Sequence, residues 1–151
     1  NIREVIRRNF LEDFRSEFQR KFEEIRRHEE EYTVGIKEDY EPVAYDRHGT
    51  EVPVVNLSGG EKTSVALAYR LALADLAAQV SQTSPSEILI LDEPTTGFDQ
   101  EDIKLLPQAL RNIRTIPQII IVTHDEELKN AADYKFEVTK EMGISTIKEL
   151  S

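Results

Sequence analysis

The sequence predicts an α/β protein in which helices flank a parallel-rich sheet. Two unbroken apolar runs, residues 88–91 and 119–122, are each followed by polar residues. That pattern is typical of parallel strands that are buried on both faces. Helical patterns precede the first run and separate it from the second, which is the element order of an α/β sheet.

Residues 1–30 predict one long helix. The large apolar side chains of residues 10–25 project into an arc about 120° wide around the helix axis. Ile2, Val5 and Ile6 lie on a rotated face, so the apolar stripe drifts along the helix. We interpret the main stripe as core and expect the rotated face to meet a different partner.

Two short strands and a second helix are predicted next. Apolar and polar residues alternate at 32–36 and again at 43–45, which indicates a hairpin turning at 39–42. Residues 46–56 are predicted to form a loop. A segment rich in Ala and Leu then favours a helix from Leu57 to about Val80.

Shorter elements accompany the two apolar strands in the last third of the chain. A third helix is predicted after Asp99, with a disturbance near Pro107, because proline lacks the backbone N–H that a helix needs. A short helix is predicted after Asp125. Two alternating segments around Met142 and Gly143 predict a hairpin.

Composition limits the function classes. The 151 residues have a formal net charge of −10, so polyanions are repelled at long range and tight DNA binding by this lobe alone is disfavoured. The absence of cysteine excludes disulfides and thiolate metal sites. No apolar run has membrane-spanning length, and we expect a soluble, cytoplasmic protein with no membrane partner. Because the chain opens at Asn1 directly in a helical pattern, we interpret it as a fragment.

Ionisable residues follow both apolar strands. Asp92 and Glu93 come after the first strand, and His124 comes after the second. Because ligands of α/β sheets bind at the carboxyl ends of the strands, we expect these side chains to share one edge. Alternation along the chain would point the two carboxylates to opposite sides, so that one serves a metal ion and the other a reacting group. The alternative is a solvated loop after a core strand.

The start of the second helix has two interpretations. Ser58 and Glu61 have the spacing of a capping box, in which each side chain bonds the other residue's backbone N–H. Gly59 and Gly60 between them also suggest an anion site, because a helix start exposes N–H groups and glycine lets a ligand approach closely. Both interpretations can hold together.

The phosphate-binding loop of nucleotide-binding proteins is missing from these residues. No Gly-x-x-x-x-Gly-Lys-Ser/Thr segment occurs. That loop cradles the β-phosphate, supplies a lysine and holds Mg²⁺ through a hydroxyl group. The sequence therefore predicts one half of a nucleotide site, with the other half supplied by another polypeptide.

Four segments resemble the motifs of ABC-type ATPase heads, in the same order and at the same spacing. Residues 57–61, Leu-Ser-Gly-Gly-Glu, resemble the signature motif. Residues 88–93 resemble the Walker B strand followed by the catalytic glutamate. Residues 96–99, Thr-Gly-Phe-Asp, resemble the D-loop, with Phe98 where many relatives have Leu, and His124 resembles the switch histidine.

Within that class the chain resembles the C-terminal lobe of the Rad-fifty double-strand-break repair ATPases, archaeal ones above all. In that family a long coiled coil separates this lobe from an N-terminal lobe that carries Walker A. The resemblance implies a coiled-coil base helix at 1–30 and an ATPase lobe at 31–151. Glu61 differs from the Gln usual in membrane transporters, and Pro94-Thr95 differs from the Val-Asp usual in SMC proteins.

The resemblance implies a role for each residue at the strand ends. Asp92 would orient the Mg²⁺ shell of bound ATP. Glu93 would activate the attacking water as general base. His124 would contact the γ-phosphate and sense its loss.

The resemblance also implies residues that act on a second copy of the head. Ser58, Gly59, Gly60 and Glu61 would close over the ATP bound by the opposite head. Asp99 would bridge the interface between the two heads. ATP would then hold the dimer together, and hydrolysis would release it.

The partners that the resemblance implies are the N-terminal Walker A lobe of the same protein, a Mre-eleven-type nuclease, and DNA through the assembled complex. Part of the Phe-rich surface of the first helix could dock the nuclease, although core packing explains the same residues. The implied location is nucleoid-associated, or nuclear in a eukaryote.

Two alternatives remain open at this point. One is a head lobe of an SMC-type, chromosome-organising ATPase. The other is a degenerate ABC-like module that assembles partners without catalysis, against which the intact Asp92, Glu93 and His124 weigh.

Overall fold

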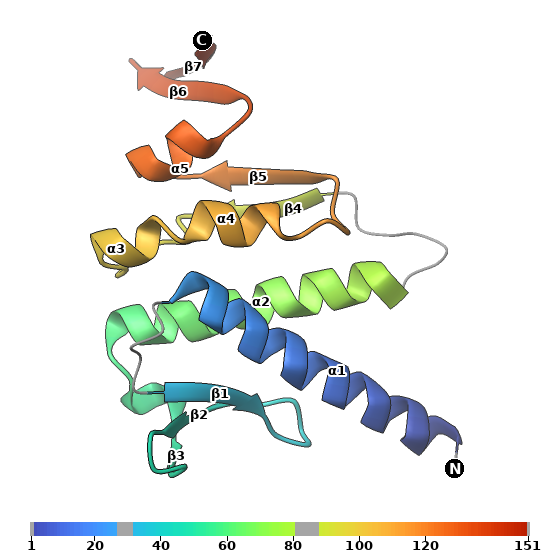
Figure 1. The fold of residues 1–151 in the computed structure, drawn as a ribbon. Coiled ribbons are helices and arrows are strands. Elements are labelled where there is room, and N and C mark those ends of the chain that lie inside the picture. Colours follow the sequence, from blue (N-terminus) through green and yellow to red (C-terminus); the bar gives the residue numbers. More distant parts are fainter. Residues whose placement is uncertain (1, 27–31, 81–87, 151) are drawn as a thin grey trace.

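The computed structural model describes residues 2–26, 32–80 and 88–150. Two long helices lie across the middle of the molecule, with an antiparallel sheet on one side of them (Figure 1). Shorter helices and a two-stranded parallel sheet lie on the other side, and a hairpin stands at the far end (Figure 1). The mixed α/β class predicted from the sequence is confirmed.

Helix α1, Ile2–Ile25, buries the predicted stripe. The rotated face stays exposed, as its separate position on the helical wheel suggested, at Ile2, Val5 and Ile6. The helix ends five residues before the predicted boundary, and residues 27–31 lie outside the described residues. The buried apolar side chains of α1 are Leu11, Phe14, Phe18, Phe22 and Ile25.

The antiparallel sheet contains the predicted hairpin. Strand β1, Tyr32–Ile36, pairs with β2, Pro42–Asp46, and β3, Glu51–Val52, pairs with β2. Residues 46–56 were expected to form only a loop, but they hold β3 and the 3₁₀ helix η1, Val54–Asn56. Elements of two or three residues are too short to produce a periodic pattern, so sequence patterns could not predict them.

Helix α2, Gly59–Val80, packs along α1. Its Tyr69 ring lies between two phenylalanines of α1, with ring centroids 4.9 Å from Phe14 and 5.6 Å from Phe18. The Tyr69 hydroxyl donates to the Tyr40 carbonyl at 2.9 Å, so this aromatic side chain joins α1, α2 and the hairpin turn. Such rings combine a large apolar area with a polar end that needs a partner.

Strand β4, Ile88–Asp92, pairs in parallel with β5, Gln118–Val122. The expectation of burial on both faces is wrong for these strands. Leu89, Leu91, Ile119 and Ile121 face the core, but the opposite face is open to solvent. The exposed fractions on that face are 49% for Ile88, 66% for Ile90, 41% for Ile120 and 54% for Val122. We call these four side chains the open sheet face.

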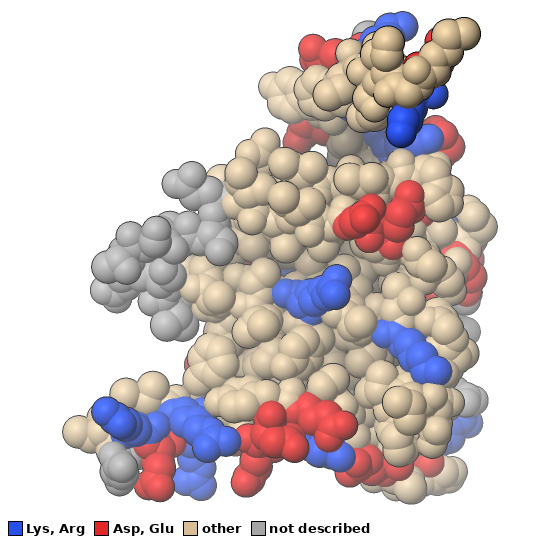
Figure 2. Space-filling view, turned by 180° about the vertical axis from the view of Figure 1, so that it is seen from behind, with Lys and Arg blue, Asp and Glu red and all other residues tan. Residues whose placement is uncertain are grey.

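The view from behind shows that the middle of the molecule carries few charged side chains (Figure 2). Charged residues gather instead along the lower edge of that view, over α1, and around the upper end (Figure 2). An apolar strand pattern without a cover on one side indicates a surface that another segment or partner would bury.

The single helix expected after Asp99 is divided into α3, Gln100–Ile103, and α4, Leu106–Arg111. Pro107 lies in the first turn of α4, where a missing N–H costs no helical hydrogen bond, so the helix restarts at the proline. Helix α5, Glu126–Ala131, follows β5 as predicted.

Strands β6, Lys135–Glu141, and β7, Ile144–Leu150, form the predicted hairpin around Met142 and Gly143. Two of the three sheets are therefore antiparallel, and the parallel sheet has two described strands, so a parallel-rich sheet is not observed in the described residues. Across the ranges 2–26, 32–80 and 88–150, no helix is both long and apolar enough to span a membrane.

Candidate functional site

The carboxyl ends of β4 and β5 bring two of the predicted residues together. Asp92 is in register with Val122, and the Glu93 N–H continues the ladder by donating to the Val122 carbonyl at 2.8 Å. Immediately beyond, Glu93 Oε2 lies 2.9 Å from His124 Nδ1. The prediction that these strand ends share one edge of the sheet is confirmed.

Glu93 has an unusual backbone conformation. Its φ of +43° lies in the left-handed region that non-glycine residues rarely occupy. The turn that follows holds it, because the Thr96 N–H and Thr96 hydroxyl both donate to the Glu93 carbonyl, at 3.3 and 3.0 Å. Strain of this kind persists where the surroundings fix it, and it is concentrated at functional sites.

The charge state of His124 depends on Glu93. The hydrogen bond to the Glu93 carboxylate, and then the negative charge of that carboxylate, raise the pKa of His124 above its ordinary value of 6.5. The imidazole is exposed, so solvent reaches it directly. This arrangement favours a cationic ring at the edge of the sheet.

A second link between the strand ends was not predicted. The buried Thr95 hydroxyl makes a hydrogen bond with the Asp125 carboxylate. The Asp125 N–H in turn donates to the Thr123 hydroxyl at 3.0 Å. These residues hold the segments after β4 and β5 against each other. In the sequence, these residues are only Thr or Asp near a proposed site residue. Such neighbours are too common for sequence reasoning to have identified this link.

The start of α2 contains the predicted capping box. The Ser58 N–H donates to Glu61 Oε2 at 2.7 Å, and the Glu61 N–H donates to Ser58 Oγ at 3.3 Å. These reciprocal bonds satisfy two N–H donors of the first turn, those of Ser58 and Glu61. They fix the backbone on both sides of Gly59 and Gly60.

The two glycines differ in their surroundings. A Cβ added at Gly59 would meet nothing within 4 Å, so this side stays open to a ligand. A Cβ at Gly60 would lie 2.5 Å from the Gly97 carbonyl oxygen. The second glycine is therefore required by the neighbouring loop, a reason that the sequence did not suggest.

Asp99 has a structural role that the sequence analysis did not predict. Its Oδ1 accepts the N–H groups of Glu101 at 3.0 Å and Asp102 at 2.9 Å, which caps α3. The predicted site residues therefore form two groups: Asp92, Glu93 and His124 at the sheet edge, and residues 58–61 with Gly97 and Asp99 at the start of α2.

Asp92 is the residue for which the sequence predicts contact with Mg²⁺. It is exposed at the last position of β4. Mg²⁺ is commonly held by one or two carboxylates, waters and phosphate oxygens, so a single exposed carboxylate fits it. Within the described residues, no three His, Cys, Asp or Glu side chains are grouped to hold a metal by themselves.

Comparisons with known proteins identify the family of this chain. The family profile described as RecF/RecN/SMC N terminal domain matches residues 5–146. The chain belongs to the RecF/RecN/SMC family. Rad50-type relatives include the DNA double-strand break repair Rad50 ATPase of Thermococcus kodakarensis, 42% identical over 133 residues, and that of Pyrococcus abyssi, 45% identical over 104 residues. The expected resemblance to Rad-fifty repair ATPases is confirmed.

Those alignments cover 85% and 68% of this chain but only 14% and 11% of the relatives. The chain therefore spans a small part of the proteins that it matches. The matching family profile is described as an N-terminal domain. The comparisons thus do not support the placement of this RecF/RecN/SMC chain in a C-terminal lobe.

Solved SMC structures share the fold of this family member. One is described as "Structural biochemistry of ATP-driven dimerization and DNA stimulated activation of SMC ATPases"; it covers 98% of this chain and 89% of its own, with a TM-score of 0.76 and 20% identity. Another is the Smc head domain with a coiled coil and joint from Pyrococcus yayanosii, covering 93% of this chain and 27% of its own, with a TM-score of 0.74 and 21% identity.

Proposed function

We propose that this chain is one half of an ATP-hydrolysing head that dimerises on ATP and drives DNA double-strand-break repair with a nuclease partner. The observation that carries the proposal is the Glu93–His124 pair, 2.9 Å apart at the carboxyl ends of β4 and β5, in a sequence without a phosphate-binding loop. The missing loop would come from residues outside this sequence, which we call the phosphate-loop segment.

At the sheet edge, each residue has a task that its chemistry suits. Glu93 is the general base that takes a proton from the attacking water. His124, whose pKa is raised by Glu93, presents a positive charge toward a phosphate. Asp92 would hold Mg²⁺, and the chemistry that this ion would supply is neutralisation of negative charge on the phosphates.

At the start of α2, a second site faces the nucleotide of another head. Gly59 and Gly60 offer the N–H groups and the positive dipole end of a 22-residue helix, and the capping box of Ser58 and Glu61 holds this turn in place beside the nucleotide. Asp99 bridges the two heads. ATP favours the dimer because the phosphates contact both heads, and hydrolysis removes those contacts.

The remaining partners follow from the same proposal. Residues 1–30 are the base of a coiled coil, whose second strand contacts the exposed Ile2, Val5 and Ile6, and residues 31–151 are the ATPase part. A Mre-eleven-type nuclease docks near this helix, and DNA is engaged by the assembled, nucleoid-associated complex. The relatives named as double-strand break repair ATPases support this assignment.

The second candidate function is that of an SMC-type, chromosome-organising head. The likeness to SMC head structures favours it, but at 20–21% identity that likeness concerns the fold alone. The 42–45% identity to Rad50 relatives, together with Pro94-Thr95 after the carboxylates, favours repair.

Replacement of the proposed base tests the function. In the complex of this chain with its phosphate-loop segment, Glu93→Gln should lower ATP turnover by about a hundredfold or more, because general bases contribute about that much. The same variant should accumulate ATP-bound dimers in size-exclusion measurements. Glu149→Gln, on the exposed strand β7, is the matched control and should turn over ATP normally. Full-rate turnover by Glu93→Gln would reject the role.

A further inference from the structure

Arg26, directly after α1, sends its side chain into the body of the molecule. Its N–H extends the last turn of the helix by donating to the Phe22 carbonyl at 3.1 Å. The guanidinium group lies 3.1 Å from Asp102 Oδ2, and the two side chains are 11% and 2% exposed. The same Nη1 donates to Ser64 Oγ at 3.3 Å. Arg26 therefore contacts two elements that are distant from it in sequence.

Both partners of Arg26 are bonded to proposed site residues. Ser64 Oγ donates to the Gly60 carbonyl at 2.9 Å, and the Asp102 N–H donates to Asp99 Oδ1 at 2.9 Å. The guanidinium is thus connected to the signature-like turn at 58–61 through Ser64 and to the loop at 96–99 through Asp102. A Cβ placed on Gly60 would lie 3.9 Å from Arg26 Nη1.

The contact between these two segments leaves no room for a side chain at Gly60. The Gly97 carbonyl oxygen approaches Gly60 so closely that a single added methyl group would overlap it. A guanidinium is planar and always charged, so it fixes the direction of its hydrogen bonds better than an ammonium can. Loss of the charge would remove a cation 3.1 Å from the buried Asp102 carboxylate, which is costly.

We propose that Arg26 is a positioning residue, which fixes the turn at 58–61 and the loop at 96–99 relative to each other and to the end of α1. The inference rests on the proposed function, in which these two segments face the nucleotide of the second head. A displacement of α1 would then be transmitted to them through one buried ion pair. Arg26 does not touch nucleotide in this scheme.

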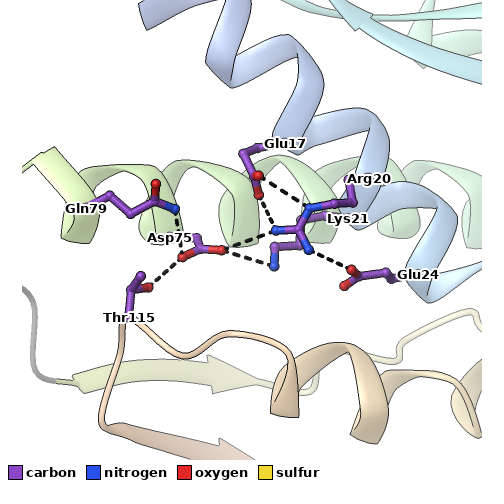
Figure 3. Close-up of polar contacts among 7 residues, drawn as sticks. All are labelled: Glu17, Arg20, Lys21, Glu24, Asp75, Gln79 and Thr115. Atoms are coloured by element: carbon purple, nitrogen blue, oxygen red, sulfur yellow. Dashed lines mark hydrogen bonds and ion pairs between the residues drawn. The ribbon is translucent and has the colours of Figure 1, made fainter.

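A second buried ion pair, formed by a lysine of α1, provides a contrast. Lys21 Nζ lies 3.2 Å from Asp75 Oδ2, in a cluster that also contains Arg20, Gln79 and Thr115 (Figure 3). This cluster fastens α1 to the later turns of α2 and to the loop before β5 (Figure 3). Of the two buried pairs, the one formed by Arg26 is bonded through its partners to the proposed site residues Gly60 and Asp99.

Hydrogen exchange measured without nucleotide tests the positioning directly. The full protein, or this chain complexed with its phosphate-loop segment, is compared with its Arg26→Gln variant. We expect amide exchange in residues 59–64 and 97–102 to accelerate about tenfold or more, because local opening controls exchange there. Arg15→Gln is the matched control: Arg15 lies on α1 and donates to the Ile36 carbonyl at 2.7 Å, away from the site. Its exchange in those two segments should stay unchanged.

Arg26→Lys covers the case in which the glutamine variant does not fold. It keeps a charge for Asp102 but loses the fork geometry, so exchange in the two segments should rise by a smaller factor. Unchanged exchange in the two segments, or an equal rise in strands β1 and β2, would overturn the proposal.

Dimerisation is the second measurement. The ATP concentration that gives half-maximal dimer should rise about tenfold for Arg26→Gln and stay unchanged for Arg15→Gln, if a displaced turn binds ATP of the other head less well. If Arg26→Gln reached half-maximal dimer at the same ATP concentration as the unmodified protein, the inference would be contradicted. If the unmodified protein forms no dimer with ATP, the proposed function fails, and the exchange measurement still decides whether Arg26 holds the two segments.

Discussion

At the residue scale, the contact between Gly60 and Gly97 links two segments that lie 37 positions apart in the sequence. Gly97 has a φ of +84°, a conformation that side chains other than glycine rarely adopt. Gly60 lies against its carbonyl oxygen. The two glycines are therefore needed for different reasons, one for backbone conformation and one for space.

A comparison of two alanine variants tests this account. Gly60→Ala should lower the free energy of unfolding by about 1–3 kcal/mol, because the backbone carbonyl of Gly97 must move away from the new methyl group. Gly59→Ala should leave stability unchanged or raise it by up to about 1 kcal/mol, since alanine favours a helix and its Cβ meets nothing. Urea unfolding of both variants measures the difference. Equal stabilities would contradict the close contact.

The titration of His124 tests the geometry at the sheet edge. Its raised pKa means that the Glu93–His124 interaction contributes stability fully below pH 6.5 and loses it as the pH rises through the raised value. In Glu93→Gln the pKa of His124 should fall back toward 6.5, because the hydrogen bond and the charge of the carboxylate are its two largest causes. NMR titration of the imidazole protons measures it, with Glu149→Gln as control. An unchanged pKa would show that the two side chains do not interact.

At the element scale, α1 is fixed by charge as well as by apolar packing. Asp75 is the centre of the cluster formed by Lys21, Arg20, Gln79 and Thr115 (Figure 3). Burial by itself would raise the pKa of Asp75, but the hydrogen bonds from Thr115 and Lys21 outweigh it and hold the pKa below 3.8. The carboxylate therefore remains charged inside the protein and needs its partners.

Replacement of Lys21 tests whether the buried Asp75 carboxylate needs this cation. Lys21→Met should lower the free energy of unfolding by about 3 kcal/mol at pH 7, because a buried carboxylate loses its nearest cation. The loss should shrink as the pH falls from 3.8 through the lower pKa of folded Asp75, where the carboxyl group becomes neutral. Lys104→Met, which breaks an exposed pair with Glu101, is the matched control and should be neutral within error. Thermal unfolding of both variants across pH measures these changes in the free energy of unfolding. Equal losses for Lys21→Met and Lys104→Met at pH 7 would be inconsistent with a buried Lys21–Asp75 pair.

Long elements could be predicted from the sequence, and short ones could not. The periodicity of α1, the Ala-rich run of α2 and the apolar runs of β4 and β5 each extend over enough residues to show a pattern. The break between α3 and α4 depends on how Pro107 packs, and β3 has only two residues. Arg26 and Asp102 gave no signal either, because a charged residue on a helix is usually solvated and only tertiary contacts reveal its burial.

At the scale of the whole molecule, apolar surface is left without a cover. The open sheet face, Ile88, Ile90, Ile120 and Val122, lies on the far side of β4 and β5 from the core. The β6–β7 hairpin also exposes Phe136, Val138 and Ile147. The sequence indicated strands covered on both sides, and the described residues supply one cover. This difference is what a head divided between two segments would show, and we expect low solubility for the chain alone.

The candidate site could be predicted only in part, because the strand patterns are visible in the sequence and the supporting hydrogen bonds are not. Asp92, Glu93 and His124 follow recognisable strands, so their shared edge followed from the parallel order of the sheet. Their supports, Thr95, Asp125 and the turn after Glu93, depend on side-chain hydrogen bonds that no spacing rule encodes.

The division of the nucleotide site is the central claim, and steady-state ATP hydrolysis measures it most directly. This chain is assayed with Mg²⁺ and ATP alone, then after addition of its phosphate-loop segment. The account predicts no turnover above background for the chain alone and Mg²⁺-dependent turnover for the mixture, because the β-phosphate has no cradle until that segment is present. Turnover by the purified chain at the rate of the mixture would contradict it.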